Sequence, residues 1–153
     1  MNNRRSFIIG IKSTKLLSEE REFIKKYKPW GIILFSRNII NVKQAKKLTS
    51  SIRKIFKDSK YPILIDQEGG RVNRLKNIIS FSNLTSEFFG KKFISKPNEF
   101  IFFYNLFIDK TSYLLKLIGI NINTTPVLDL RIKGSSNVIG DRSFSKNPRI
   151  VSK

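Results

Sequence analysis

The sequence contains no cysteine and no histidine. Without cysteine the chain forms no disulfide, so cysteine usage does not indicate a redox compartment. Without histidine it has no His general acid or base, no Ser-His or Cys-His nucleophile pair, and few of the usual zinc ligands. These absences remove several common catalytic and metal-binding chemistries from this chain.

Long apolar runs are also missing. The opening segment "MNNRRSFIIGIKS" places basic residues before an apolar run, as a signal peptide does, but this run has five residues. A signal peptide needs an apolar region of about 7–15 residues. The most apolar stretch, "FIFFYNLFI", is bounded by Glu99 and Asp109 and is far shorter than the roughly 20 residues that span a bilayer. We therefore expect no signal peptide, no membrane span and a cytoplasmic location.

Acidic residues are few, with 11 Asp and Glu against 30 Lys and Arg, so the formal net charge is +19. Such an excess attracts phosphate, which makes a non-catalytic basic module that binds nucleic acid one interpretation. However, the basic residues are spread along the chain with no run longer than two, and Lys outnumbers Arg two to one. This distribution favours compositional drift in an AT-rich genome, and we expect no nucleic-acid partner.

Strand and helix patterns alternate along a chain long enough for one domain with a sizeable core. The patterns predict strands at 7–11, 31–35 and 63–65 and within 120–130, and helices that start after Ser18, after Asn41 and at Pro97. Ser18 is predicted to cap the first helix, which Pro29 stops. Asn41 and Gln44 have the spacing of a capping box. The stretch between the third strand and Pro97 is predicted to be a long loop.

This order predicts an α/β fold with parallel strands, because each crossover is long enough for a parallel connection. The segment 31–35 is apolar throughout, as is typical of a parallel strand buried on both faces. Two architectures remain open at this point. One is a doubly wound sheet, and the other is part of a (β/α)₈ barrel, of which four strands would be about the first half.

Polar side chains follow three of the predicted strands, at the ends where function gathers in both architectures. Arg37 and Asn38 follow "GIILFS", Asp66 follows "ILI", and Asp129 ends "PVLD". A solvated loop could supply each of these groups alone, but three successive strand ends together favour a site. We therefore expect the carboxyl edge of the sheet to be functional.

The segment "ILIDQEGGRVNRL" is the most informative of these strand ends. Asp66 and Glu68 could form a carboxylate pair for acid–base chemistry, or one of them could be the ion-pair partner of Arg71 or Arg74. The two glycines between these groups permit a tight turn, and no nucleotide-cradling motif is present. Planar carboxylate and guanidinium groups also suit the vicinal hydroxyls of a sugar, since they form paired hydrogen bonds.

Taken together, "GIILFSRNI", "ILIDQEGGRVNRL", "PVLDL" and "NVIGDRSFS" resemble, in this order, the N-terminal half of the family 3 glycoside hydrolases. They are most similar to the bacterial β-N-acetylhexosaminidases that recycle cell-wall sugars. The resemblance covers nearly the whole chain and is weakest in residues 80–118. It implies a TIM-type barrel and a retaining hydrolase that removes terminal β-linked N-acetylglucosamine from muropeptides without a cofactor. Family 3 β-glucosidase is the nearest alternative activity.

The resemblance also implies roles for individual residues. It implies sugar contacts at Asp66, Arg74 and Arg142. It implies supporting roles at Asp129, Glu68 and Arg71. The family's Lys-His-Phe-Pro-Gly-His-Gly segment, its acid/base His and its nucleophilic Asp lie downstream of the matched region. We therefore expect residues 1–153 to be the N-terminal part of a truncated barrel domain, without catalytic residues or metal ligands. Such a chain would be a fragment or the product of a decaying gene.

Overall fold

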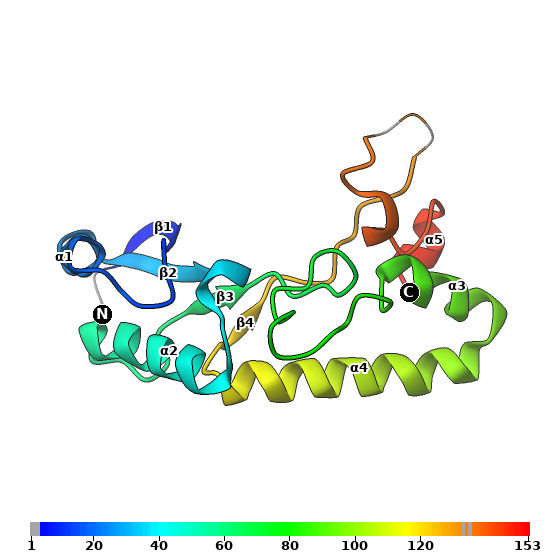
Figure 1. The fold of residues 1–153 in the computed structure, drawn as a ribbon. Helices are drawn as coiled ribbons and strands as arrows, with labels where there is room; N and C mark the ends of the chain where they lie inside the picture. The colour runs from blue at the N-terminus through cyan, green and yellow to red at the C-terminus, as the bar shows by residue number, and fades with distance from the viewer. Residues whose placement is uncertain (1–3, 133, 135) are drawn as a thin grey trace.

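The centre of the molecule is a four-stranded parallel sheet with the strand order β1-β2-β3-β4. The computed structural model describes residues 4–132, 134 and 136–153 (Figure 1). The strands are β1 (Arg5–Gly10), β2 (Pro29–Leu34), β3 (Ile63–Ile65) and β4 (Ile122–Asn123). Because all three pairings are parallel, every connection must cross over one face of the sheet.

The strand order distinguishes the two architectures that the pattern of strands and helices left open, and it confirms the barrel that the family resemblance implied. A doubly wound sheet reverses its strand order at a switch point and carries helices on both faces. In a barrel, successive strands are neighbours, and right-handed crossovers place the helices on the outer side. Here each strand pairs with its neighbours in the sequence, and α2 and α4 run along the same side of the strands (Figure 1). The arrangement is therefore that of four consecutive units of a barrel.

The described part of the chain also has five α-helices and two short 3₁₀ turns, of which η2 and α5 follow the last strand. They are α1 (Ser18–Tyr27), η1 (Ser36–Asn38), α2 (Val42–Phe56), α3 (Ser86–Ser95), α4 (Pro97–Leu117), η2 (Gly140–Arg142) and α5 (Pro148–Val151). The predicted start of α4 at Pro97 is confirmed. Although α4 has 21 residues, no helix among the described residues is apolar enough over its length to cross a membrane.

Of the two predicted helix caps, one is confirmed and the other is wrong. The capping residue Asn41 is confirmed, because its side-chain oxygen accepts a hydrogen bond from the Gln44 backbone N–H at 2.9 Å. The prediction that Ser18 caps α1 is wrong, since Ser18 is already the first helical residue. Instead the Glu20 carboxylate accepts from the backbone N–H of Leu17 at 3.0 Å. The helix thus satisfies one free N–H with its own acidic first turn.

Helix α3 lies where the sequence predicted only loop. Its start is capped by Thr85, whose hydroxyl accepts a hydrogen bond from the backbone N–H of Phe88 at 3.0 Å. Aromatic contacts then hold it against α4, with the Phe89 and Phe107 rings 5.3 Å apart. Tertiary packing of this kind stabilises a ten-residue helix that is marginal alone.

The core lies between the sheet and its helices, and it fixes β3 most firmly. All three residues of β3 are buried. The buried core cluster comprises Ile11, Ile24, Ile32, Leu34, Ile39, Ala45, Leu48, Ile52, Tyr61, Ile63, Ile65, Leu75, Leu115, Ile118 and Ile120. Because β2 and β4 flank β3, the end of this strand is held on both sides and makes a rigid base for the residues that follow.

Strand β4 is shorter than the sequence indicated. A strand was predicted within 120–130, but only Ile122 and Asn123 are assigned to it. The ladder ends where the backbone N–H of Thr124 donates to the carbonyl of Ile65 at 2.9 Å. Among the described residues β4 pairs with β3 alone, so nothing on its other side extends it. Asp129 therefore does not lie at the end of a strand.

Candidate functional site

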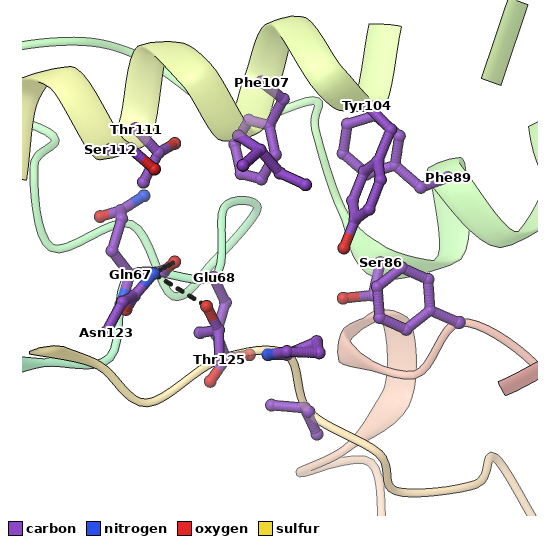
Figure 2. Close-up of a pocket in the computed structure, with 14 residues that line it drawn as sticks. Gln67, Glu68, Ser86, Phe89, Tyr104, Phe107, Thr111, Ser112, Asn123 and Thr125 are labelled. Carbon is purple, nitrogen blue, oxygen red and sulfur yellow. Dashed lines mark hydrogen bonds between the residues drawn. The ribbon is translucent and has the colours of Figure 1, made fainter. Parts of the chain in front are cut away.

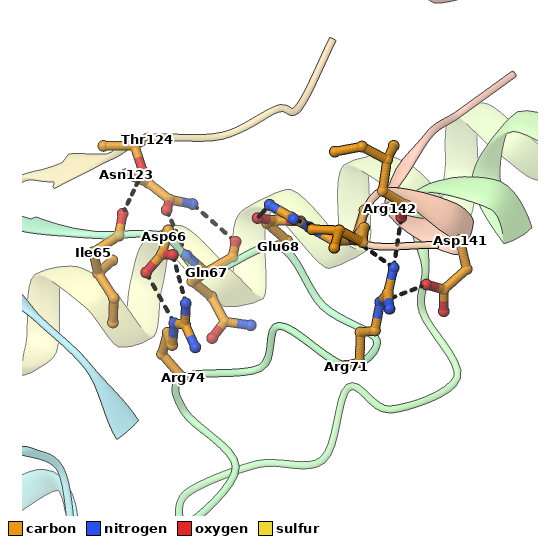
Figure 3. A network of polar contacts seen from close by, with 12 residues as sticks. Ile65, Asp66, Gln67, Glu68, Arg71, Arg74, Asn123, Thr124, Asp141 and Arg142 are labelled. Atoms are coloured by element: carbon orange, nitrogen blue, oxygen red, sulfur yellow. Dashed lines mark hydrogen bonds and ion pairs between the residues drawn. The ribbon is translucent and has the colours of Figure 1, made fainter. Parts of the chain in front are cut away.

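Three arginine–carboxylate pairs line the carboxyl edge of the sheet, in the loop that follows β3 and in the segment around η2. Figure 3 shows them side by side. They join Asp66 to Arg74, Glu68 to Arg142, and Asp141 to Arg71. The structure thus brings together five of the six positions for which the family resemblance implied a role.

Asp66 and Arg74 form a two-pronged ion pair directly after β3. Arg74 Nε donates to Asp66 Oδ1 at 2.9 Å, and Nη2 donates to Oδ2 at 2.6 Å. The hydrogen bond to Asp66 raises the pKa of the Arg74 guanidinium above its usual value. Each Asp66 oxygen keeps a lone pair beyond the one that Arg74 uses, and the side chains are 25% and 26% exposed. The pair can therefore accept hydrogen bonds from ligand hydroxyls.

Glu68 and Arg142 form a second two-pronged pair that connects segments 74 residues apart. Arg142 Nε donates to Glu68 Oε2 at 2.8 Å, and Nη2 donates to Oε1 at 2.7 Å. The hydrogen bond to Glu68 raises the pKa of Arg142. The Glu68 side chain is only 5% exposed, so its charge depends on this partner.

Arg71 anchors the segment that carries Arg142. Its Nη2 donates to the backbone carbonyls of residues 137, 138 and 139 at 2.8, 2.7 and 2.7 Å. Its Nε lies 2.9 Å from Asp141, and both side chains are well exposed. An exposed ion pair of this kind contributes little to stability, so the carbonyl contacts are the larger structural contribution of Arg71.

Glu68→Gln is expected to destabilise the fold more than Asp141→Asn, because only the Glu68 pair is buried. Losing charge-assisted hydrogen bonds while Arg142 stays partly buried should cost about 2 kcal/mol of unfolding free energy. The exposed Asp141 pair should cost about 0–1 kcal/mol. Chemical denaturation of both variants measures the difference. Equal losses would show that burial of Glu68 has no energetic consequence.

The glycines of this segment form the predicted tight turn. Gly69 has φ +94°, and its carbonyl accepts from the backbone N–H of Val72 at 3.0 Å. A Cβ on Gly69 would lie 2.2 Å from the backbone carbonyl oxygen of Leu84. The turn therefore requires glycine both for its backbone conformation and for the close approach of another segment. It returns the chain so that Arg74 reaches Asp66.

Polar residues after the other strands have mixed roles. Asn38 is fully buried and donates to the carbonyls of Ile11 and Ser13 at 3.1 and 2.8 Å, so it ties the strand ends together. Arg37 donates to the Ile11 carbonyl at 3.0 Å. Asp129 is exposed and makes no hydrogen bond or ion pair with the described residues, although its charge helps to raise the pKa of Arg142.

Two further residues of the site were missed by sequence reasoning. Gln67, between the two carboxylates, is buried, and its side-chain oxygen accepts from the Leu75 backbone N–H at 3.0 Å. Asn123 holds the Gln67 backbone through its side-chain amide. A polar residue within an apolar edge strand was the available signal for Asn123, but its partner is 56 positions away.

A cavity of about 250 Å³ lies behind this loop, between the loop, α3, α4 and residues 123–127 (Figure 2). Gln67 Nε2 and Thr111 Oγ1 are buried atoms of its lining, and neither has a hydrogen-bond partner in the described structure. Glu68 also lines it, whereas Asp66, Arg74 and Arg142 do not. This cavity has room and polar atoms for ordered water, and it is separate from the open face of the Asp66–Arg74 pair.

The arrangement suits binding rather than proton transfer. Asp66 and Glu68 each accept two hydrogen bonds from a different arginine, so they do not form the facing carboxylate pair that acid–base chemistry uses. Across residues 4–132, 134 and 136–153, no group of three or more acidic, His or Cys side chains could hold a metal ion. Fixed carboxylates and guanidiniums can bind a neutral polyhydroxylated ligand through paired hydrogen bonds.

Known proteins are similar to this chain in sequence and in fold. A beta-hexosaminidase of Xanthomonas euvesicatoria pv. vesicatoria (strain 85-10) is 32% identical over 148 residues, covering 94% of this chain and 42% of the relative. A beta-hexosaminidase of Hydrogenovibrio crunogenus (strain DSM 25203 / XCL-2) is 34% identical over 146 residues, covering 95% and 40%. The chain thus spans about two fifths of the length of these relatives.

Solved structures support the same relationship. Native NagZ from Neisseria gonorrhoeae superimposes with a TM-score of 0.83 and 30% identity, covering 97% of this chain and 43% of NagZ. The same protein in complex with N-trifluoroacetyl-D-glucosamine gives a TM-score of 0.72 and 29% identity, covering 97% and 44%. The pattern of the glycosyl hydrolase family 3 N terminal domain matches residues 7–153. Sequence, strand order and superposition agree, and the chain belongs to the glycosyl hydrolase family 3 N terminal domain family.

Proposed function

We propose that this chain forms the sugar-binding edge of a β-N-acetylhexosaminidase barrel that removes terminal β-linked N-acetylglucosamine. The observation that carries the proposal is the Asp66–Arg74 pair, which is fixed after a buried strand and keeps open acceptor positions. Two related proteins are named beta-hexosaminidase, and one solved relative holds an N-acylated glucosamine. These names support N-acetylglucosamine over glucose, the sugar of the alternative β-glucosidase activity.

In this proposal Asp66 and Arg74 bind sugar hydroxyls, and Arg142 contributes a third contact. Arg142 uses Nε and Nη2 for Glu68, and its Nη1 has only a long contact of 3.5 Å with the Val138 carbonyl. That nitrogen is the donor that a sugar oxygen could accept from. Glu68 and Arg71 then position Arg142 without touching the sugar.

We propose that groups outside this edge of the sheet carry out the chemical step. Residues 1–153 contain no histidine, and the carboxylates of this edge are already paired with arginines. We therefore propose that this chain binds sugar and supplies neither the acid/base nor the nucleophile of a retaining hydrolase. The proposed substrate is a muropeptide from the cell wall, and the proposed location is the cytoplasm.

Isothermal titration of the chain with N-acetylglucosamine, and separately with glucose, tests this function. We expect saturable heat with N-acetylglucosamine and weaker binding of glucose, since the N-acyl group adds contacts. Equal or tighter binding of glucose would favour the β-glucosidase alternative. No heat with either sugar would overturn sugar binding by this chain.

A further inference from the structure

Asn123 holds the peptide groups on either side of Gln67. Its Oδ1 accepts from the Gln67 backbone N–H at 3.0 Å, and its Nδ2 donates to the Gln67 carbonyl at 3.2 Å (Figure 3). The first group belongs to the peptide that follows Asp66, and the second belongs to the peptide that precedes Glu68. One side chain therefore fixes the backbone between the two carboxylates.

This contact replaces sheet hydrogen bonds at the point where the sheet ends. Ile65 is paired with Asn123 in the ladder between β3 and β4, and the last backbone bond joins Thr124 to Ile65. Beyond it, the loop has no backbone partner on β4. The Asn123 amide carries both a donor and an acceptor, as a peptide group does, so it extends the ladder by one residue.

Gln67 passes this constraint on to the arginine partner of Asp66. Its side chain is 1% exposed, and its Oε1 accepts from the Leu75 backbone N–H at 3.0 Å. Leu75 follows Arg74 directly in the chain. The backbone that carries Asp66 and the backbone that carries Arg74 are thus joined through Gln67, which Asn123 holds in place.

We propose that Asn123 is a positioning residue of the sugar site, acting through Gln67 on Asp66, Glu68 and their arginines. Nδ2 of Asn123 also donates to the Thr125 hydroxyl at 2.8 Å, which fixes the orientation of its amide. The expected effect on sugar affinity rests on the proposed function. The effect on the arginine pairs does not, because it is a property of the free protein.

Asn121 is a matched control two residues earlier on the same side of the chain. Its Oδ1 accepts from the Ile63 backbone N–H at 2.8 Å, and its Nδ2 donates to the carbonyls of Lys60 and Tyr61 at 3.2 Å each. Asn121 thus makes three side-chain hydrogen bonds, as Asn123 does, although one of those of Asn123 goes to a hydroxyl instead of a carbonyl. They hold the opposite end of β3, away from Asp66.

The experiment compares Asn123→Ala with Asn121→Ala by chemical denaturation, by N-acetylglucosamine titration, and by NMR exchange of the arginine Nε–H protons with water. We expect similar losses of stability in both variants. Asn123→Ala should weaken sugar binding about tenfold, and Asn121→Ala less than about twofold. The Nε–H protons of Arg74 and Arg142 should exchange faster in Asn123→Ala alone. If Asn123→Ala does not fold, Asn123→Asp takes its place, because its side-chain oxygen can still accept from the Gln67 backbone N–H but it has no amide group to donate to the Gln67 carbonyl.

Sugar affinity and the exchange of the arginine Nε–H protons together separate the positioning role of Asn123 from the proposed function. If wild-type protein binds no sugar but the exchange difference is present, the proposed function fails and the positioning role stands. If wild-type protein binds sugar and the two variants behave alike in affinity and exchange, Asn123 is only a structural residue. The same exchange rates in both variants and in wild type would also overturn the positioning role.

Discussion

Asp66→Asn is expected to weaken N-acetylglucosamine binding by about 100-fold, since hydrogen bonds to a charged group contribute about 1.5–3 kcal/mol each. The amide keeps the shape of the carboxylate but has only one acceptor oxygen. Its NH₂ group would face the Arg74 guanidinium, which now donates to both Asp66 oxygens. Both the sugar acceptor and the orientation of Arg74 are therefore lost. Titration calorimetry measures the change in Kd.

Asp129→Asn is the matched control for this prediction. It removes the same charge, but Asp129 is exposed and makes no hydrogen bond or ion pair with the described residues, although its charge helps to raise the pKa of Arg142. We expect its Kd to stay within about twofold of wild type, because solvent and salt weaken the interactions of an exposed charge that has no direct partner. Equal weakening in both variants would indicate a general effect of charge. Unchanged affinity in Asp66→Asn would remove Asp66 from the site.

Gly69→Ala is expected to lower the free energy of unfolding by about 2–5 kcal/mol, from backbone strain of about 1–2 kcal/mol and overpacking of about 1–3 kcal/mol. The strain arises from φ +94°. The overpacking arises because a Cβ would lie 2.2 Å from the Leu84 carbonyl oxygen, which is backbone and cannot rotate away. Because Gly69 begins the turn that returns Arg74 to Asp66, sugar affinity should fall as well.

The variant Gly134→Ala separates the effect of backbone strain from the effect of overpacking. Gly134 has a similar φ of +83°, but no heavy atom of the described residues lies within 4 Å of the place that an added methyl group would take. It should therefore show the strain alone, about 1–2 kcal/mol, with no effect on sugar binding. Denaturation curves of the two variants give the comparison. Similar losses at both positions would mean that the contact with Leu84 relaxes freely.

Local patterns were good predictors where the structure depends on neighbours in the chain. Asn41 caps α2 and Pro97 begins α4 as predicted, because capping and the fixed φ of proline act over a few residues. The alternation of strands and helices predicted the α/β class for the same reason. Helix α3 was missed since its stability comes from aromatic contacts with α4, which no local pattern reveals.

The motif around Asp66 also identified the edge of the sheet where the arginine–carboxylate pairs lie, and the resemblance it carries identified the family. The motif did not predict which arginine pairs with which carboxylate at that edge. From the sequence, Arg71 and Arg74 were both candidates for Asp66 or Glu68, but Arg71 binds Asp141 and three carbonyls, and Glu68 binds Arg142. Arg142 is 74 positions from Glu68, and the choice follows from how the chain folds back.

The amino-acid sequence was thus sufficient for the class of fold, the strand that leads to the site, and the residue types at its end. These features follow from periodicity, capping and turn chemistry, which act over short distances. Periodicity alone did not determine the strand order, which only the family resemblance implied, and the pairing of each arginine and the contact of Asn123 with Gln67 required the folded chain. Each depends on contacts between segments far apart in the sequence, whose energies are set by burial and geometry after β3 and β4 have paired.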